Sequence, residues 1–460
     1  MFLKGFLTSI FIITIQKICK SSESINLNEP LILTPYIERN ETDLAKNLSL
    51  VDHEYFLKIK SYSGFLTVNK KYNSNLFFWF FPALNEKQLN TTPWIIWLDG
   101  GPGYSSMQGL FGNIGPLKVE DGQVTARQVT WASDYSVLFV DNPVGAGFSF
   151  TDHDDGYPNN EEDIGAQMYV FLQQFLELFP ELRSSPLFIS GQSYAGKYVP
   201  ALAIQIHRHS GQDKPIKLKG ISIGNGLIDP KPMMKYSQLC KELGILEGAD
   251  LVKLKELEDS VVGFINKGEI VNASNAFNAT IKHIAHRSGV SVYNYNQKPS
   301  PKNQAPGFEH FLNRPDVRSR IHAGSGRFHL NNQLVYAKML PDIMASVKGY
   351  VEELLEHYGV LVYNGQLDVI LPYSLAKNVY DGFHWSRQGE FRNATRRQLI
   401  DGQNKLIGYI KHGDNLVEAL IRLAGHAVPT DQPESAKYLI DLFIDAFKSD
   451  KEYIIIEYIK

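Results

Sequence analysis

Cysteine is scarce in this sequence, with Cys19 and Cys240 the two among 460 residues. Secreted proteins commonly rely on disulfides, but Cys19 lies in or at the edge of an N-terminal segment that we expect to be removed. The mature chain is therefore predicted to contain no internal disulfide. Cys240 is interpreted as a small buried apolar residue, in preference to a catalytic thiol.

An excess of either charge is also absent. The chain has 46 Lys and Arg against 49 Asp and Glu, a formal net charge of -3. A nucleic-acid-binding protein presents a basic surface, so this balance gives no support for such a partner. With 43% hydrophobic and 21% charged residues, the composition excludes a disordered, collagen-like or coiled-coil chain. It indicates a soluble globular enzyme or binding protein.

A hydrophobic run long enough to span a bilayer is missing too. The uncharged segment 5–16 is too short, because a membrane helix needs about 20 residues. It follows Lys4 and precedes the polar residues 20–24, which is the order of a secretory signal peptide, assigned here to residues 1–20. The alternatives are a buried N-terminal helix or an uncleaved anchor. We expect a mature protein without a membrane span, in the secretory pathway, either secreted or in lysosomes or other vesicles.

Glycosylation motifs agree with that route. Six Asn-x-Ser/Thr triplets mark candidate sites, at Asn40, Asn47, Asn90, Asn272, Asn278 and Asn393. An Asn-rich chain produces several such triplets by chance, so their weight comes from agreement with the signal peptide. Two pairs of closely spaced histidines lack the cysteine or acidic partners of a metal site, and no metal is predicted.

The chain alternates segments typical of strands and of helices. Apolar runs of strand length occur at residues 76–81, 94–98, 136–140, 187–189, 221–223 and 360–363, and helical spacing at 164–178 and 436–447. This alternation predicts an α/β fold with a mostly parallel sheet flanked by helices, as one domain over residues 21–460. Residues from about 228 to 350 break the alternation and include a helical run. They are predicted to form an inserted helical cap over the catalytic edge of the sheet.

A serine lies where an α/β-hydrolase carries its nucleophile. Residues 191–196 (GQSYAG) follow the predicted strand 187–189 and precede a helical run, which predicts a strand, a tight turn bearing Ser193, and a helix. The turn needs small neighbours because it is strained. Here Ala195 and Gly196 replace the usual single glycine.

Two further residues complete a candidate catalytic triad. Asp368 follows the predicted strand 360–363, and His426 follows an apolar run at 416–423 that we interpret as the last strand. Ser193, Asp368, His426 is the chain order of α/β-hydrolase triads. Each residue alone has an ordinary structural explanation. Their common order and their positions at strand ends favour a nucleophile, an orienting acid and a base.

The sequence resembles the serine carboxypeptidases, most closely the vitellogenic-like members from animals. The matching segments are residues 63–68, 76–80, 97–103, 141–149, 191–196, 363–368 and 425–426. The resemblance implies an α/β-hydrolase fold with a helical insertion. It also implies removal of C-terminal residues from peptides or proteins, with no metal or organic cofactor.

The resemblance assigns roles to individual residues. Ser193 would be the nucleophile, His426 the general base and then acid, and Asp368 the group that orients the imidazole. The backbone N–H groups of Gly101 and Tyr194 would form the oxyanion hole.

The pocket for the substrate's terminal carboxylate departs from the family pattern. Relatives use an amide, a glycine N–H and two glutamates there; this chain has Asp99, Gly100, Asn113 and Gln192. Both acids have become amides, and the amide has become an acid. The predicted function is a serine-type carboxypeptidase acting through an acyl-enzyme, with an altered carboxylate subsite. The alternatives are an acyltransferase of the same type and a peptide-binding relative with little or no activity.

Overall fold

The computed structural model describes residues 28–85, 88–211, 214–299 and 306–449. The predicted signal peptide and Cys19 lie outside these ranges. Within them, no helix is long and apolar enough to cross a membrane.

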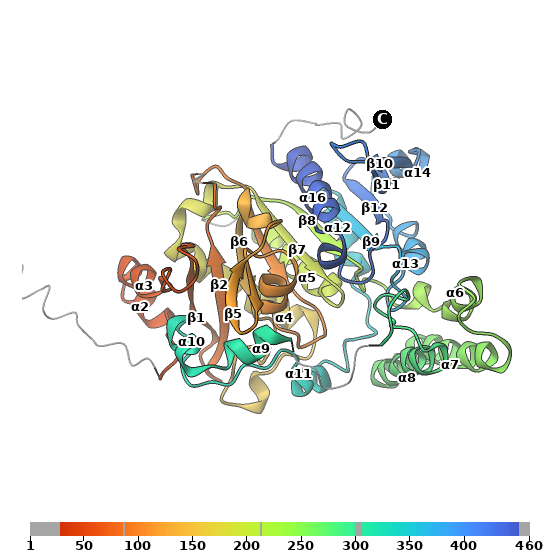
Figure 1. The fold of residues 1–460 in the computed structure, drawn as a ribbon, viewed down its shortest axis with the longest axis horizontal. Coiled ribbons are helices and arrows are strands. Elements are labelled where there is room, and N and C mark those ends of the chain that lie inside the picture. Colours follow the sequence, from red (N-terminus) through yellow and green to blue (C-terminus); the bar gives the residue numbers. More distant parts are fainter. Residues whose placement is uncertain (1–27, 86–87, 212–213, 300–305, 450–460) are drawn as a thin grey trace, which may run out of the picture.

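A ten-stranded sheet forms the centre of the molecule (Figure 1). From one edge to the other the strands are β1 (Tyr62–Asn69), β2 (Ser74–Phe81), β6 (Ser136–Val140), β3 (Trp94–Leu98), β7 (Leu187–Gln192), β8 (Leu218–Gly224), β9 (Gly359–Gly365), β12 (Leu416–Ile421), β11 (Leu406–Gly413) and β10 (Arg397–Ile400). The six strands from β6 to β12 in this order are parallel. Antiparallel strands complete both edges.

All the strands predicted from apolar runs are present, and the predicted mostly parallel sheet is confirmed. The sequence reasoning missed β1, β10 and β11, and also a small hairpin of β4 (Leu117–Glu120) and β5 (Gln123–Ala126). Strands β4, β5 and β10 are short and largely exposed, and glycines and polar residues interrupt the apolar residues of β1 and β11, so their pattern is weaker. The last parallel strand ends at Ile421, two residues before the end of the predicted run.

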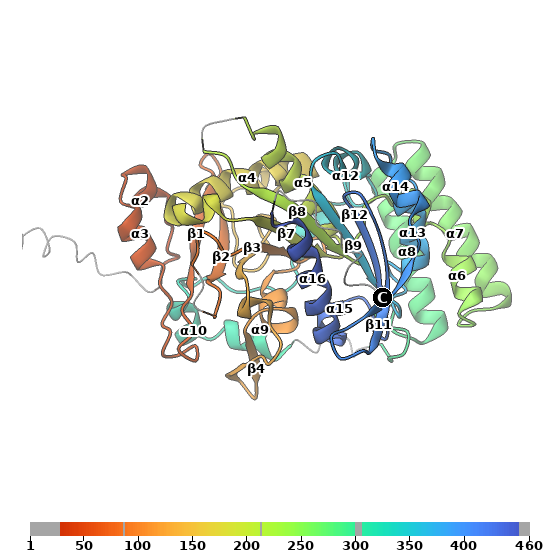
Figure 2. The ribbon, with the colours of Figure 1, turned by 90° about the horizontal axis from the view of Figure 1, so that it is seen from above.

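Helices cover both faces of the sheet (Figure 2). On one face lie α4 (Glu161–Leu178), α5 (Ala195–Arg208) and α12 (Lys348–Leu355); α16 (Pro433–Phe447) covers the other. Successive side chains of β2 divide between the two cores, with Phe78 packing on one side and Phe77 and Trp79 on the other. The apolar run of this strand follows from that arrangement, because both of its faces are buried.

Between β8 and β9, ahead of α12, lies the segment predicted to be an inserted cap, called the insertion below. It contains α6 (Tyr236–Glu242), α7 (Gly248–Asn266), α8 (Ile270–Ser288), α9 (Gly307–Leu312), α10 (Pro315–Arg320) and α11 (Gln333–Lys338). In the described part of this segment, no strand joins a sheet. Helices α7 and α8 pack as a hairpin at one end of the molecule (Figure 1).

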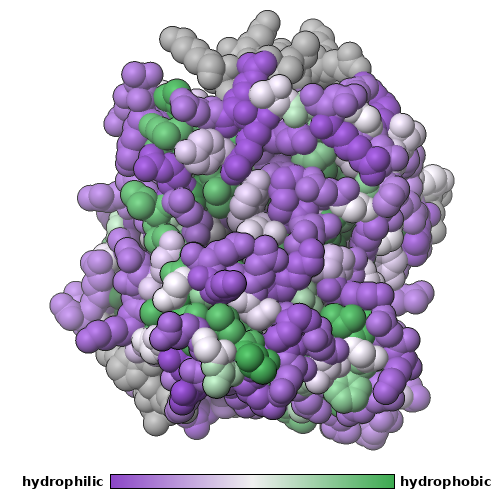
Figure 3. Space-filling view, turned by 90° about the vertical axis from the view of Figure 1, so that its right-hand side faces the viewer, coloured by the Kyte–Doolittle hydropathy of each residue, from purple (hydrophilic) through white to green (hydrophobic). Residues whose placement is uncertain are grey.

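The surface at that end is mainly hydrophilic. Figure 3 shows small separate hydrophobic groups on a polar face. Val252 of α7 and Val271 of α8 are 63% and 41% exposed. Isolated exposed apolar residues are common on folded proteins.

The remaining α-helices are short. They are α2 (Thr34–Glu38), α3 (Thr42–Leu48), α13 (Tyr373–Tyr380), α14 (Gln388–Asn393) and α15 (Val428–Asp431). Helix α15 begins two residues after His426 and leads directly towards α16.

A substitution at Gly365 tests how closely the ends of β9 and β12 are packed. A Cβ atom at this position would lie 1.9 Å from the carbonyl oxygen of Gly425, the residue before His426. We expect Gly365→Ala to lower the free energy of unfolding by about 1–3 kcal/mol through overpacking, measured by urea denaturation. The matched control is Gly263→Ala in α7, where an added Cβ meets nothing within 4 Å. It should stabilise the helix by about 0.5–1 kcal/mol. Equal stability of Gly365→Ala and the parent would contradict the prediction.

Candidate active site

Ser193 occupies a strained turn between β7 and α5. Its φ angle is 64°, a conformation that residues with side chains seldom adopt. The Ser193 N–H donates to the carbonyl of Gly224 at 2.9 Å, and the Ser193 carbonyl accepts from Gly196 at 2.9 Å. Small residues are required here, because a Cβ on Gly191 would lie 2.6 Å from the Leu98 carbonyl oxygen. The strand, turn and helix predicted around Ser193 are therefore present.

Asp368 and His426 are in direct contact. His426 Nδ1 lies 2.8 Å from Asp368 Oδ2, and both side chains are almost fully buried. Because Nδ1 faces a carboxylate, we assign it the proton, which leaves Nε2 as the acceptor nitrogen. Nε2 is buried and has no hydrogen-bond partner among the described residues. The imidazole is thus arranged to accept a proton at Nε2.

Asp368 receives four hydrogen bonds. Besides His426, its Oδ2 accepts from Asn225 Nδ2 at 2.6 Å, while Oδ1 accepts from the backbone N–H groups of Ile370 and Leu371 at 2.9 and 3.3 Å. These donors hold the carboxylate in one orientation. The sequence reasoning missed Asn225, which follows β8 at the same edge of the sheet. A search for polar residues at the carboxyl ends of parallel strands would have found it.

The parallel strands bring these residues to one edge. Ser193 follows β7, Asp368 follows β9 and His426 follows β12, and with β8 these strands are consecutive neighbours in the sheet. Carboxyl ends of adjacent parallel strands lie side by side. The order of the strands therefore brings the three residues to one edge, although Ser193 and His426 are more than 230 residues apart in the chain.

The glycine loop after β3 lies directly against the turn that carries Ser193. A Cβ on Gly100 would be 2.5 Å from the Tyr194 backbone nitrogen and 2.9 Å from Ser193 Cβ. Gly101 has a φ angle of 114°, which favours glycine. This close approach is what an oxyanion hole formed by backbone donors requires.

Asp141 anchors the glycine loop to a second loop. Its carboxyl group accepts from the Ser105 hydroxyl, from the Ser106 N–H at 3.1 Å and from the Phe148 N–H at 2.8 Å. Burial raises the pKa of Asp141 to about 7 despite these three donors. The side chain is fully buried and tends to stay protonated in mildly acidic solution.

Asp99 and Gln192 contact each other beside Ser193. Gln192 Nε2 donates to Asp99 Oδ1 at 2.8 Å, and Trp97 Nε1 donates to Asp99 Oδ2 at 2.8 Å. Burial raises the pKa of Asp99 to about 6, although the donors from Trp97 and Gln192 partly oppose that shift. Gln192 Oε1 is buried and has no hydrogen-bond partner in the described chain.

Asn113 does not join this pair. Its Oδ1 accepts from Gln108 Nε2 at 3.3 Å and from Thr430 Oγ1 at 3.1 Å. Its Nδ2 is buried without a partner among residues that the structure describes. The structure thus brings Asp99 and Gln192 into contact and leaves Asn113 with an available donor.

The insertion reaches the histidine through Tyr293. The ring of Tyr293 packs 5.3 Å from the His426 imidazole, and its carbonyl accepts from the His426 N–H at 2.7 Å. Tyr293 is 52% exposed. Sequence reasoning did not single out this residue, because no periodicity or motif distinguishes a loop tyrosine that contacts a site through the fold.

A model of the serine carboxypeptidase family matches residues 52–446. The chain belongs to the serine carboxypeptidase family. It is 39% identical to the venom serine carboxypeptidase of Apis mellifera over 93% of both chains. It is 37% identical to the vitellogenic carboxypeptidase of Aedes aegypti and to a probable serine carboxypeptidase of Homo sapiens, over 90% of each chain.

Solved structures that are similar to this fold include Kex1(delta)p, a prohormone-processing carboxypeptidase from Saccharomyces cerevisiae, with a TM-score of 0.77. The identity is 24%, over 87% of this chain and 96% of that one. This likeness establishes the α/β-hydrolase fold. The family membership identifies the chain as a serine-type carboxypeptidase, and the predicted family resemblance is confirmed.

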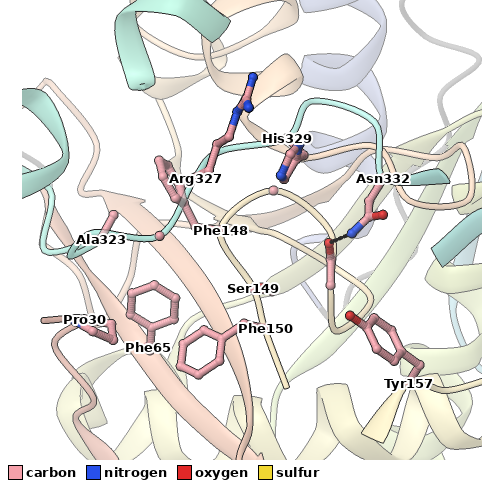
Figure 4. Close-up of a pocket in the computed structure, with 13 residues that line it drawn as sticks. Pro30, Phe65, Phe148, Ser149, Phe150, Tyr157, Ala323, Arg327, His329 and Asn332 are labelled. Carbon is pink, nitrogen blue, oxygen red and sulfur yellow. Dashed lines mark hydrogen bonds between the residues drawn. The ribbon is translucent and has the colours of Figure 1, made fainter. Parts of the chain in front are cut away.

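A hollow lies beside the loop that contains Gly145 and Gly147. It has a volume of about 360 Å³ and is lined by aromatic rings, including Phe65 and Phe150, with Arg327 and His329 above them (Figure 4). Asn332 closes one side by donating to the Gly145 carbonyl at 2.8 Å. None of the three triad candidates lines it.

The candidate glycosylation sites differ in exposure. Asn40, Asn47, Asn90, Asn272 and Asn393 are exposed, whereas Asn278 is half-buried in α8. Asn278 Oδ1 accepts from the Tyr336 hydroxyl at 2.7 Å. The five exposed asparagines are therefore more accessible to glycosylation than Asn278.

The described residues contain no group of three or more His, Cys, Asp or Glu side chains that could hold a metal. Cys240 is buried, as expected, and burial raises the pKa of its thiol to about 12.

The raised pKa of Asp99 predicts a pH-dependent stability. The unfolded chain loses this proton near pH 4, whereas the folded protein holds it to about pH 6. Stability from Asp99 is therefore fully present below pH 4 and is lost as pH rises through 6. Asp99→Asn removes the ionisation, and rotation of the Gln192 amide lets Oε1 accept from the new amide.

We expect the variant to gain about 1–3 kcal/mol over the parent between pH 4 and 7, since one pKa unit corresponds to about 1.4 kcal/mol. Urea denaturation at several pH values measures this. The control is Asp316→Asn, at an exposed carboxyl whose pKa is lowered by the Arg314 side chain. Asp316→Asn should slightly lower the free energy of unfolding, because the ionised form of Asp316 is the one that the folded protein favours. A difference in the free energy of unfolding between Asp99→Asn and the parent that does not change with pH would contradict the prediction.

Proposed function

We propose that this serine carboxypeptidase cleaves C-terminal residues from peptides with Ser193, His426 and Asp368 as its triad. The observation that carries the proposal is the Asp368–His426 hydrogen bond. It leaves His426 Nε2 buried, without a hydrogen-bond partner among the described residues, at the sheet edge that carries Ser193. A neutral imidazole held in this tautomer is suited to accept the serine proton. The nearby strained turn supports Ser193 as the nucleophile.

The proposed reaction proceeds in two stages. Ser193 Oγ attacks the last peptide carbonyl as its proton passes to His426, and the N–H groups of Gly101 and Tyr194 stabilise the oxyanion. His426 then protonates the departing amino group, which leaves Ser193 as an ester. Water activated by His426 hydrolyses this acyl-enzyme and restores the serine. An amine acceptor in place of water would make the same site an acyltransferase.

Ser193→Ala should lower kcat by about 10⁶-fold, and Asp368→Asn by about 10⁴-fold, because the imidazole is retained but loses its orienting partner. His426→Ala should match Ser193→Ala. Mass spectrometry of a digested peptide measures the loss and shows whether residues leave from the C-terminus. Ser260→Ala is the control, at an exposed hydroxyl in α7 that donates to the Glu256 carbonyl. Undiminished turnover by Ser193→Ala would overturn the mechanism.

We further propose that Asp99, the Gly100 N–H, Asn113 and Gln192 hold the substrate's terminal carboxylate. Asn113 Nδ2 is a buried donor without a partner in the described chain, and Gln192 Nε2 points at Asp99. A substrate carboxylate beside Asp99 places two like charges in contact, so one proton would be shared between them. Binding should therefore be strongest when Asp99 is protonated.

This arrangement predicts acid-favoured binding of peptides with a free C-terminus. Burial already raises the pKa of Asp99 to about 6, and a bound carboxylate raises it further. Because the Asp99 pKa is higher in the complex, affinity is greatest below about pH 6. It declines as pH rises through the pKa of Asp99 in the complex. Asp99→Asn should lower KM for such peptides near pH 7.5 and flatten the dependence of KM on pH.

The measurement is KM from about pH 4 to 7.5 for parent and variant, with a free-acid peptide and its C-terminal amide. The amide carries no charge, so Asp99→Asn should change its KM little. We expect the parent to accept the amide better than typical family members do. If the two free-acid profiles coincide, Asp99 does not face the carboxylate.

We also propose that the protein enters the secretory pathway through residues 1–20 and acts outside the cell or in an acidic vesicle. The glycosylation motifs support that route. The raised pKa values of Asp99 and Asp141 suit an acidic compartment, because both side chains are buried and cheaper to hold uncharged there.

A further inference from the structure

Five buried polar side chains form a cluster behind the turn that carries Ser193. They are Glu161 at the start of α4, Tyr194, Lys197 and Tyr198 at the start of α5, and Asp342 between α11 and α12. All are at most 7% exposed. The cluster therefore joins two of the sheet's flanking helices to the insertion.

Asp342 is the centre of the cluster. Its Oδ2 accepts from the Tyr194 hydroxyl at 2.7 Å and forms an ion pair with Lys197 Nζ. Lys197 also donates to the Asp342 backbone carbonyl, and its ammonium lies 5.2 Å from the centre of the Tyr194 ring. Tyr198 packs edge-on against Tyr194, with the ring planes at 78° and the ring centres 5.1 Å apart. The side chain that follows the nucleophile is thus held on two sides.

Stability is a weak explanation for this arrangement. Burying a lysine with two acids costs much of what their attraction returns, and apolar side chains of similar size often stabilise a protein as well. The cluster is instead distinguished by what it contacts. Tyr194 supplies one of the two backbone N–H groups of the proposed oxyanion hole, and its side chain is tied to the insertion through Asp342.

We propose that Lys197, Asp342 and Glu161 are positioning residues that fix Tyr194, and with it the oxyanion-hole N–H, only while the cluster holds a single negative charge. This inference rests on the proposed function, because it assigns Tyr194 to the oxyanion hole. The oxyanion exists only in the reaction, so a misplaced N–H weakens the chemical step more than the binding of substrate.

Glu161 makes the cluster sensitive to protonation. It lies against Tyr194 and Asp342, yet neither of its carboxyl oxygens makes a hydrogen bond of ordinary geometry with the described residues. The single positive charge of Lys197 can neutralise one carboxylate, and Asp342 is already paired with it. Burial and the Asp342 charge therefore raise the pKa of Glu161 well above its usual value, with partial opposition from Lys197.

The titratable groups that interact with Glu161 come from three parts of the chain. They are Tyr194, Lys197 and Tyr198 from the turn and α5, Asp342 from the insertion, and Tyr350 from α12. Lys197 is the one cation among them. Loss of the Glu161 proton puts a second negative charge beside Asp342, which competes for Lys197 and for the Tyr194 hydroxyl. The cluster is therefore intact at acidic pH and loosens as pH rises through the Glu161 pKa.

The test uses two mild variants of the full chain with a peptide substrate. Tyr194→Phe removes the hydroxyl that bonds Asp342 but keeps the ring and the Lys197–Asp342 pair. We expect kcat to fall by about tenfold or more, with KM changed less than about twofold, as for a displaced oxyanion donor. Glu161→Gln preserves shape and cannot ionise. It should retain the parent's kcat near pH 5 and move the alkaline limb of the kcat profile up by about one pH unit.

The chain offers a matched control at Asp441. This carboxyl on α16 also binds a tyrosine hydroxyl and a lysine, Tyr135 and Lys437, on the opposite face of the sheet. Asp441→Asn should leave kcat and its pH profile unchanged. Thermal melting confirms that each variant is folded.

Two results would overturn the inference: a parental kcat in Tyr194→Phe, or a parental alkaline limb in Glu161→Gln. If either occurs while Ser193→Ala is inactive, the proposed function stands and the positioning role fails. If Ser193→Ala remains active, the proposed function fails, and this inference fails with it.

Discussion

The parallel hydrogen bonding of β7, β8, β9 and β12 is the constraint on which the site depends. It places the carboxyl ends of these four strands side by side, and each delivers one polar residue to the same edge: Ser193, Asn225, Asp368 and His426. Asn225 and two backbone N–H groups hold Asp368, and Asp368 holds the imidazole. A change in strand order would separate these residues whatever their identity.

Close backbone packing is the second requirement. The loop after β3 must approach the turn at Ser193, and glycine at position 100 permits it, because a Cβ there would clash with the Tyr194 nitrogen. Asp141 holds that loop from behind through three donors. Rigid support of this kind matters for catalysis, since donors must already be aimed where negative charge develops.

Buried acids link the site to pH. Asp99, Asp141 and Glu161 lie on three different segments, and burial raises the pKa of each. Each is more easily held uncharged than ionised, so the folded protein is favoured by mild acid on all three counts. Asp99 faces the proposed substrate pocket, Asp141 supports the glycine loop, and Glu161 lies behind Tyr194. One physical cause, desolvation, thus raises the pKa of all three acids, including the two that the proposals assign to substrate binding and to the support of Tyr194.

The sequence by itself determined the parallel sheet, the turn at Ser193 and the candidates Asp368 and His426, because apolar runs and strand-end motifs are local patterns. Only the tertiary structure decided that Gln192 donates to Asp99, that Asn113 stands apart, and that Asn225, Tyr293 and the Asp342 cluster support the site. These contacts join residues far apart in the chain whose neighbours carry no periodic signal. Their meaning arises from burial and from the partners that folding supplies, which local patterns do not record.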